Sequence, residues 1–78
     1  MNLYLIWQEE NMGYDTYDSC VVCAENIDEA CKIHPNGNWE DEFDNEWASS
    51  PEKVYARLLG KAESYIPKGV ILASFNAG

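Results

Sequence analysis

The most restrictive feature of this sequence is a short apolar run at its start, LYLIW, residues 3–7. The run is dense in β-favouring residues and ends at the polar stretch Gln8-Glu9-Glu10. Because every position in it is apolar, it predicts a strand that is buried on both faces and therefore lies in the centre of a sheet. A chain of 78 residues without an internal repeat forms one small core. We therefore expect one domain spanning residues 1–78.

A second strand is predicted at residues 17–24, YDSCVVCA, after a loop that contains Gly13. The loop is short enough for the two strands to form an antiparallel hairpin. Because side chains alternate along a strand, two sets point to opposite faces. Tyr17, Ser19, Val21 and Cys23 belong to one set, and Asp18, Cys20, Val22 and Ala24 belong to the other.

A short helix is predicted to begin at Asn26. Glu29 follows three residues later, in the asparagine variant of a capping box, and Asp28 lies in the favourable first turn. We expect about two turns, ended by Pro35-Asn36-Gly37 and stable only when packed on the sheet. The spacing predicts one apolar face made of Ile27, Ala30, Cys31 and His34.

Residues 52–63 fit two structures. Ser50-Pro51-Glu52 is a good helix start, whereas residues 54–59 also fit a strand with Val54, Ala56 and Leu58 facing the core. We favour the strand, since Gly60 costs a helix interior about 1 kcal/mol. Residues 69–75, GVILASF, predict the last strand. The order ββαββ gives an α+β domain in which one short helix packs on an antiparallel sheet.

The cysteines and the single histidine offer little chemistry. Cys20 and Cys23 have the CxxC spacing of zinc and redox sites, but on a strand they point to opposite faces and cannot converge on one ion about 2.3 Å away. Only Cys31 and His34 could add ligands, and three cysteines do not suit a disulfide scaffold. We expect buried thiols, no metal and no cofactor.

The sequence also lacks the motifs of common enzymes. His34 has no serine or cysteine near it in a triad pattern, and no glycine-rich phosphate loop occurs. No acidic run has the central glycine of a calcium-binding EF-hand loop. We therefore predict a non-enzymatic protein.

The charge is strongly negative and unevenly distributed. Of the net −9, residues 1–50 contribute −11, with 12 acids against the single base Lys32, and residues 51–78 contribute +2. Such a field repels nucleic acid and anionic membranes and speeds encounter with basic surfaces. We expect a basic protein surface as the partner, with no direct binding to nucleic acid or membrane.

The sequence predicts a cytoplasmic protein. No stretch approaches the roughly 18 to 20 apolar residues of a membrane span. The run at residues 3–7 lacks the length and basic flank of a signal peptide.

The segment NWEDEFDNEW, residues 38–47, holds five carboxylates and three large aromatic residues. Trp39, Phe43 and Trp47 recur every four residues, which predicts a short helix or ordered loop, with Asn38 as a possible cap, that docks its aromatic side chains on the sheet. The carboxylates would form like-charge pairs four residues apart, each destabilising by a few tenths of a kcal/mol. An excess of one sign at such positions indicates a function.

Two interpretations of this acidic segment remain open. The carboxylates could occupy positions that phosphates take in the nucleic-acid groove of a partner. Alternatively, exposed tryptophans could anchor an ordinary protein interface that the acids steer. In the first case binding depends on many acids, and in the second it depends on Trp39 or Trp47. The predicted partner-binding residues are Trp39, Glu40, Asp41, Glu42, Asp44, Glu46 and Trp47.

Four stretches resemble a family of short, mostly uncharacterised proteins encoded by phages and prophages: MNLYLIWQEEN, GYDTYDSCVVCAEN, IHP and GVILASFNAG. The resemblance covers most of the chain and transfers no catalytic residue. It implies a phage setting, in which small acidic proteins often inhibit host defence. Anti-CRISPR proteins are the best-known case, and some of them act as DNA mimics. The resemblance also favours a strand at residues 53–61.

These observations together predict a non-enzymatic phage or prophage inhibitor of a host nucleic-acid-binding defence protein of the CRISPR-Cas kind. Its acidic surface would compete with nucleic acid for a basic site. The alternative is a structural or regulatory protein-interaction module of phage biology, in which the negative charge serves solubility. The sequence leaves the oligomeric state open.

Overall fold

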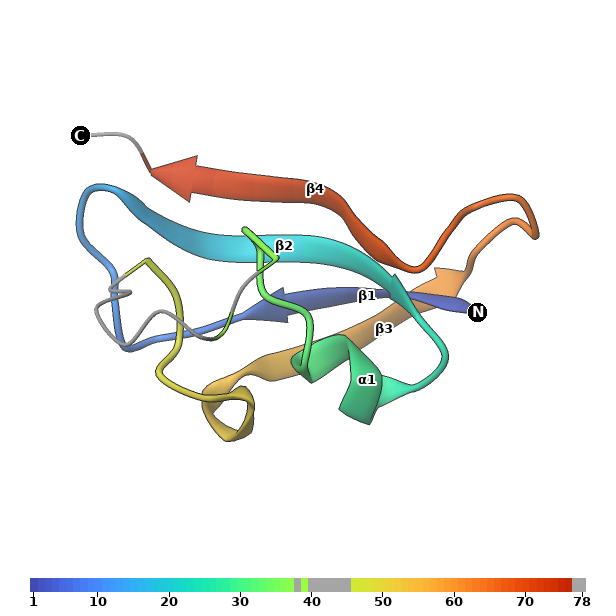
Figure 1. Cartoon of the computed structure of the whole chain (residues 1–78), viewed down its shortest axis with the longest axis horizontal. Helices are drawn as coiled ribbons and strands as arrows, with labels where there is room; N and C mark the ends of the chain where they lie inside the picture. Colours follow the sequence, from blue (N-terminus) through green and yellow to red (C-terminus); the bar gives the residue numbers. More distant parts are fainter. Residues whose placement is uncertain (38, 40–45, 77–78) are drawn as a thin grey trace.

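The structure is a computed structural model that describes residues 1–37, 39 and 46–76. Along the chain it contains β1 (Asn2–Trp7), β2 (Thr16–Ala24), α1 (Ile27–Cys31), a 3-10 helix η1 (Pro51–Lys53), β3 (Tyr55–Lys61) and β4 (Gly69–Asn76) (Figure 1). The predicted α+β class, with one antiparallel sheet and one short helix, is confirmed. No helix among these residues is long and apolar enough to cross a membrane.

The four strands form one sheet in the order β3-β1-β2-β4, and every neighbouring pair is antiparallel. β1 is therefore central, as its apolar sequence predicts. Tyr4 of β1 lies opposite Val22 of β2 and Leu58 of β3, so these three side chains belong to one face of the sheet. The register in this way assigns every strand residue to a face.

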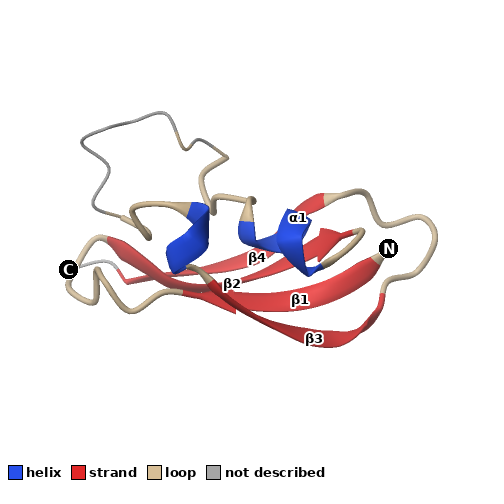
Figure 2. Ribbon diagram, turned by 90° about the horizontal axis from the view of Figure 1, so that it is seen from below, coloured by secondary structure: helices blue, strands red, loops and turns tan. Residues whose placement is uncertain are grey.

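Both helices lie on the same face of the sheet, which we call the covered face (Figure 2). The core forms between this face and the chain above it, where Ile6, Val22, Ala30 and Trp47 are fully buried. The other face, which we call the open face, carries no helix of the described chain (Figure 2). Its side chains are those of Leu3, Leu5, Trp7, Ser19, Val21, Cys23, Tyr55, Arg57, Leu72 and Ser74, of which Cys23 alone is buried.

The prediction that β1 is buried on both faces is therefore only half right. On the covered face, Tyr4 and Ile6 are buried. On the open face, Leu3, Leu5 and Trp7 are only partly buried, since they are shielded mainly by side chains of the neighbouring strands. The apolar outer positions of β1 are the first sign that the open face is unusual.

One face assignment on β2 is wrong because the strand contains a bulge. The register shifts between Tyr17 and Ser19, which leaves Asp18 as an extra residue. As a result Tyr17 does not share a face with Ser19. Its ring instead packs against the core on the covered side, with its centroid 4.8 Å from that of Phe75 in β4.

The strand predicted after residue 53 is confirmed, and the helix-like start before it forms the single 3-10 turn η1. Val54 is buried and Ala56 packs against the core, as expected. Leu58 was expected in the core but is 57% exposed, because β3 is an edge strand. A second bulge places Leu3 opposite Gly60 and leaves Leu59 extra. The φ of +154° at this glycine is one that other residues rarely adopt.

The helix α1 is shorter than predicted. It ends at Cys31, because the next N–H groups bond three residues back, Lys32 to the carbonyl of Glu29 and Ile33 to that of Ala30. Ala30 is fully buried, but Ile27 is 49% exposed, so the predicted apolar face is wrong at Ile27. His34 is buried but lies beyond the helix and is not one of its C-terminal residues.

The predicted start of the helix is confirmed. Asn26 Oδ1 accepts the Glu29 N–H at 2.9 Å. The Glu29 carboxylate in turn accepts the Glu25 N–H at 3.2 Å and pairs with Lys68 Nζ at 3.2 Å. Its hydrogen bond with the Lys68 ammonium lowers the pKa of Glu29. The helix N-terminus is thus tied to the connection between β3 and β4.

Replacing Asn26 by alanine tests this cap. We expect Asn26→Ala to lower the free energy of unfolding by about 1 kcal/mol, because the Glu29 N–H loses its acceptor. The matched control is Asn26→Asp, which keeps an oxygen at the same position and should stay within about 0.5 kcal/mol of the wild type. Urea denaturation measures both values, and equal stability of the alanine variant and the wild type would contradict the assignment.

Candidate protein-binding site

The acidic segment starts from an anchored tryptophan. Trp39 is partly buried, and its indole Nε1 donates a hydrogen bond to the carbonyl of Lys32 at 2.6 Å. Its ring meets the imidazole of His34 edge-on, with 5.0 Å between the centroids. The imidazole is buried, and its Nδ1 accepts the Asn36 N–H at 3.1 Å. Trp39 is therefore held against the turn that follows α1.

The segment returns to the fold at a second anchored tryptophan. The side chain of Trp47 is fully buried, and its ring centroid lies 6.4 Å from that of His34. The main chain is also held, since Asn11 Nδ2 donates to the carbonyl of Trp47 at 2.6 Å and the Tyr17 N–H donates to that of Glu46 at 2.7 Å. The return point is therefore fixed on the hairpin of β1 and β2.

These contacts divide the predicted site residues into two groups. Trp47 has no exposed surface, so the expectation that it contacts a partner is wrong, and it serves as an anchor. Trp39 keeps part of its surface, and Glu46 is partly buried. The other predicted residues lie outside the described residues: Glu40, Asp41, Glu42 and Asp44, together with the aromatic Phe43 and the cap Asn38.

The hairpin that receives the segment is itself held by a buried amide. Gln8 is 1% exposed, and its Nε2 donates to the carbonyls of Asn11 at 2.7 Å and Tyr17 at 3.0 Å. Its Oε1 accepts the N–H groups of Glu10 at 2.7 Å and Asn11 at 2.8 Å. Both donors and both lone pairs of the amide are therefore in use. One side chain fixes the shape of the loop.

This loop brings two further acids to the site. Glu9 and Glu10 are exposed, and Glu10 Oε1 accepts a hydrogen bond from Ser49 Oγ at 3.2 Å. The loop and the residues that follow Trp47 therefore lie side by side. The sequence did not predict Glu9 and Glu10 as site residues. The available signal was the alternation of side chains along β1. Since Tyr4 and Ile6 face the core, the same alternation places Gln8 on the covered face, where the loop begins.

The cysteines do not form a site. Cys20 lies in the core on the covered face, whereas Cys23 is buried on the opposite side, with its Sγ 4.0 Å from Met1 Sδ and 3.9 Å from the carbonyl of Ile66. The predicted opposite orientation is confirmed, so the two thiols cannot bind one ion. Burial raises the pKa of Cys20 to about 11, which keeps this thiol protonated at neutral pH. Within the described chain, no three potential metal ligands lie together.

Comparison of the chain with models of known families, with curated proteins and with solved structures gives no match. The resemblance to phage proteins therefore stays a prediction from the sequence. What the site can do has to be argued from its own geometry.

The buried amide of Gln8 makes a direct test of the loop possible. Gln8→Met keeps the length of the side chain but leaves two N–H groups and two carbonyls without their partner. We expect the free energy of unfolding to fall by at least about 2 kcal/mol, since each unsatisfied buried group costs about 1–3 kcal/mol. Urea denaturation measures the loss.

The control for this variant is Glu9→Met, at the neighbouring exposed position, which should change stability by less than about 0.5 kcal/mol. Equal stability of the two methionine variants would show that water replaces the amide and that Gln8 does not hold the loop.

Proposed function

We propose that the protein is a non-enzymatic inhibitor, encoded by a phage or prophage, that binds a basic nucleic-acid-binding surface of a host defence protein of the CRISPR-Cas kind. It acts in the host cytoplasm and competes with nucleic acid for that surface. The observation that supports this proposal best is the anchoring of the acidic segment at both ends. Trp39 holds one end and Trp47 the other, and the rings of both lie close to that of His34.

Anchored ends make an acidic segment a better ligand for a basic groove. Five carboxylates lie in sequence between the two tryptophans. Because both ends are already fixed, ordering the segment on a partner costs less conformational entropy than ordering a free chain. A groove that binds nucleic acid presents lysines and arginines spaced for a dense polyanion, and the net charge of −9 steers the approach.

The two tryptophans favour charge mimicry over tryptophan anchoring. Trp47 is fully buried, and the indole N–H of Trp39 is used within the chain. The interaction with a partner therefore falls mainly to the carboxylates. Glu10 adds one more beside Ser49, and the exposed Glu9 precedes it in the same loop. Binding through so many charges depends strongly on salt.

One observation favours the alternative, a structural or regulatory interaction module. The open face exposes aromatic and aliphatic side chains, among them Tyr55 at 51% and Leu72 at 69%. A partner that used this face would bind mainly by apolar burial and would depend little on salt. Salt dependence therefore separates the two functions.

The test is affinity capture from a lysate of the bacterial host across a salt series. We expect the immobilised protein to retain a nucleic-acid-binding protein that is released by rising salt and by added double-stranded DNA. A variant with amides at all five segment positions should lose at least about tenfold in affinity and show a shallower salt dependence. Its substitutions are Glu40→Gln, Asp41→Asn, Glu42→Gln, Asp44→Asn and Glu46→Gln.

Two double variants localise the effect. Glu9→Gln with Glu10→Gln removes charge beside the segment and should weaken capture. Glu25→Gln with Glu63→Gln removes the same charge from exposed positions just after the ends of β2 and β3, beside the start of β1, and should change capture much less. Equal effects of the two pairs, or a captured protein that DNA does not displace, would contradict charge mimicry at this site.

A further inference from the structure

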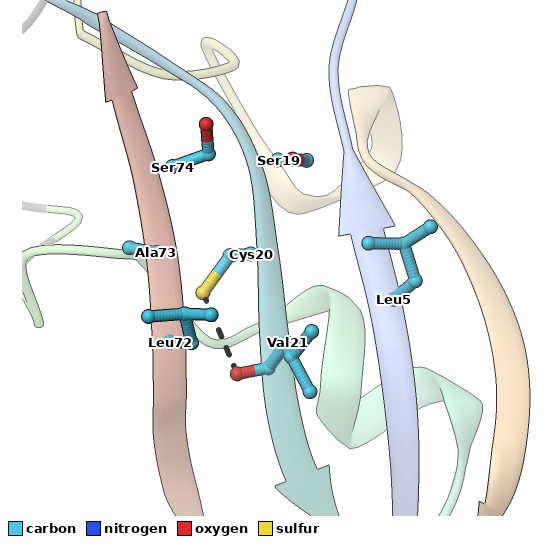
Figure 3. Close-up of a pocket in the computed structure, with 7 residues that line it drawn as sticks. All are labelled: Leu5, Ser19, Cys20, Val21, Leu72, Ala73 and Ser74. Carbon is cyan, nitrogen blue, oxygen red and sulfur yellow. Dashed lines mark hydrogen bonds between the residues drawn. The ribbon is translucent and has the colours of Figure 1, made fainter.

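The open face is more apolar than is usual for a sheet surface in contact with water. The exposed face of an antiparallel sheet is normally polar. Here the register sets Leu5 between Arg57 and Val21, and Val21 beside Leu72, so that one row with three aliphatic residues crosses all four strands. Figure 3 shows Leu5, Val21 and Leu72 on three adjacent strands, with α1 on the far side of the sheet. This face is built to be covered.

The side chains on this face are those that anchor protein interfaces. Trp7 of β1 stacks on Tyr55 of β3, with 5.6 Å between the ring centroids and 17° between the planes. Arg57 lies on the same face two residues further along β3 and is exposed. Tryptophan, tyrosine and arginine are the residues most enriched among those that carry binding energy.

The charge distribution indicates which partner fits. None of the ten residues named for the open face is acidic, although the chain contains 14 acids. Arg57 is the only charged residue among them, and the nearest acid shown is Asp18 at the margin of the face, where its Oδ1 accepts a hydrogen bond from Ser19 Oγ at 3.4 Å. Two copies of a chain with net charge −9 repel each other over most of their surface, and the repulsion is least where the acids are absent. The open face is the part of the sheet on which such copies can meet.

We propose that a second copy of the chain covers the open face, in a two-fold symmetric dimer whose sheets pack face to face. Viewed down its shortest axis the molecule presents the sheet broadside (Figure 1) and measures 35 Å by 22 Å in the other two directions. This outline encloses the whole chain, so the open face contributes at most the roughly 800 Å² that each partner gives to a standard interface. We therefore expect a reversible dimer that rests on apolar burial.

This dimer leaves both anchored ends of the acidic segment free. Trp39 and Trp47 pack on the covered face, which points away from the second copy. The inference therefore goes beyond the proposed function and does not depend on it. If both hold, each dimer presents two acidic segments on opposite sides.

Sedimentation of the purified protein between about 1 µM and 1 mM tests the proposal. We expect a monomer and dimer equilibrium in this range. Leu72→Glu on β4 and Arg57→Glu on β3 each place two carboxylates in the symmetric interface, and each should weaken the dimer at least about tenfold. Both positions are exposed in the single chain, so both variants should fold, which circular dichroism checks.

The matched control is Leu58→Glu, since this leucine is 57% exposed but belongs to the other face of the sheet. It should leave the equilibrium unchanged. A wild-type monomer at every concentration would overturn the proposal and leave the face to a foreign partner. A dimer weakened by Leu72→Glu but not by Arg57→Glu would overturn it too, because that result indicates pairing through the edge of β4.

Discussion

The side-chain amide of Gln8 is the interaction on which the rest of the site depends. All four of its hydrogen bonds are formed within the protein, and they hold the loop after β1 in one conformation. That loop presents Asn11 to the carbonyl of Trp47 and places Glu10 beside Ser49. A buried amide destabilises the fold when its hydrogen bonds are missing, and it rigidifies the surrounding chain when all of them are formed. The acidic segment is thus held by a polar contact at the end of β1 as well as by the core.

The fold separates three kinds of surface on a very small domain. The covered face supplies the core, in which Trp47 is fully buried beside the buried His34. The segment between Trp39 and Trp47 carries the densest negative charge in the sequence. The open face is largely apolar, and none of the residues named for it is acidic. Within the described residues, both helices cover the same face of the sheet, so the apolar side chains of β1 on the open face stay only partly buried.

Regular features could be predicted from the sequence, and local irregularities could not. The strands, their antiparallel pairing, the Asn26 cap and the opposite orientation of the two cysteines follow from periodicity and capping chemistry. Tyr17 was misplaced because nothing in the sequence marks the extra residue Asp18. The alternation places Leu58 on the correct face, opposite Tyr4, but the sequence does not show that β3 lies at the edge of the sheet, where this face is exposed. For the site, spacing indicated that the tryptophans anchor the segment, yet the role of Gln8 depends on contacts that only the fold creates.

The central claim is that the acidic segment is fixed to the fold at both ends. Hydrogen exchange followed by NMR tests it most directly, through the indole N–H of Trp39, bonded to Lys32, and the main-chain N–H of Tyr17, bonded to Glu46. We predict that both exchange as slowly as the amides that pair β1 with β2. Exchange of either proton at the rate of an exposed loop, while the strands stay protected, would contradict the claim.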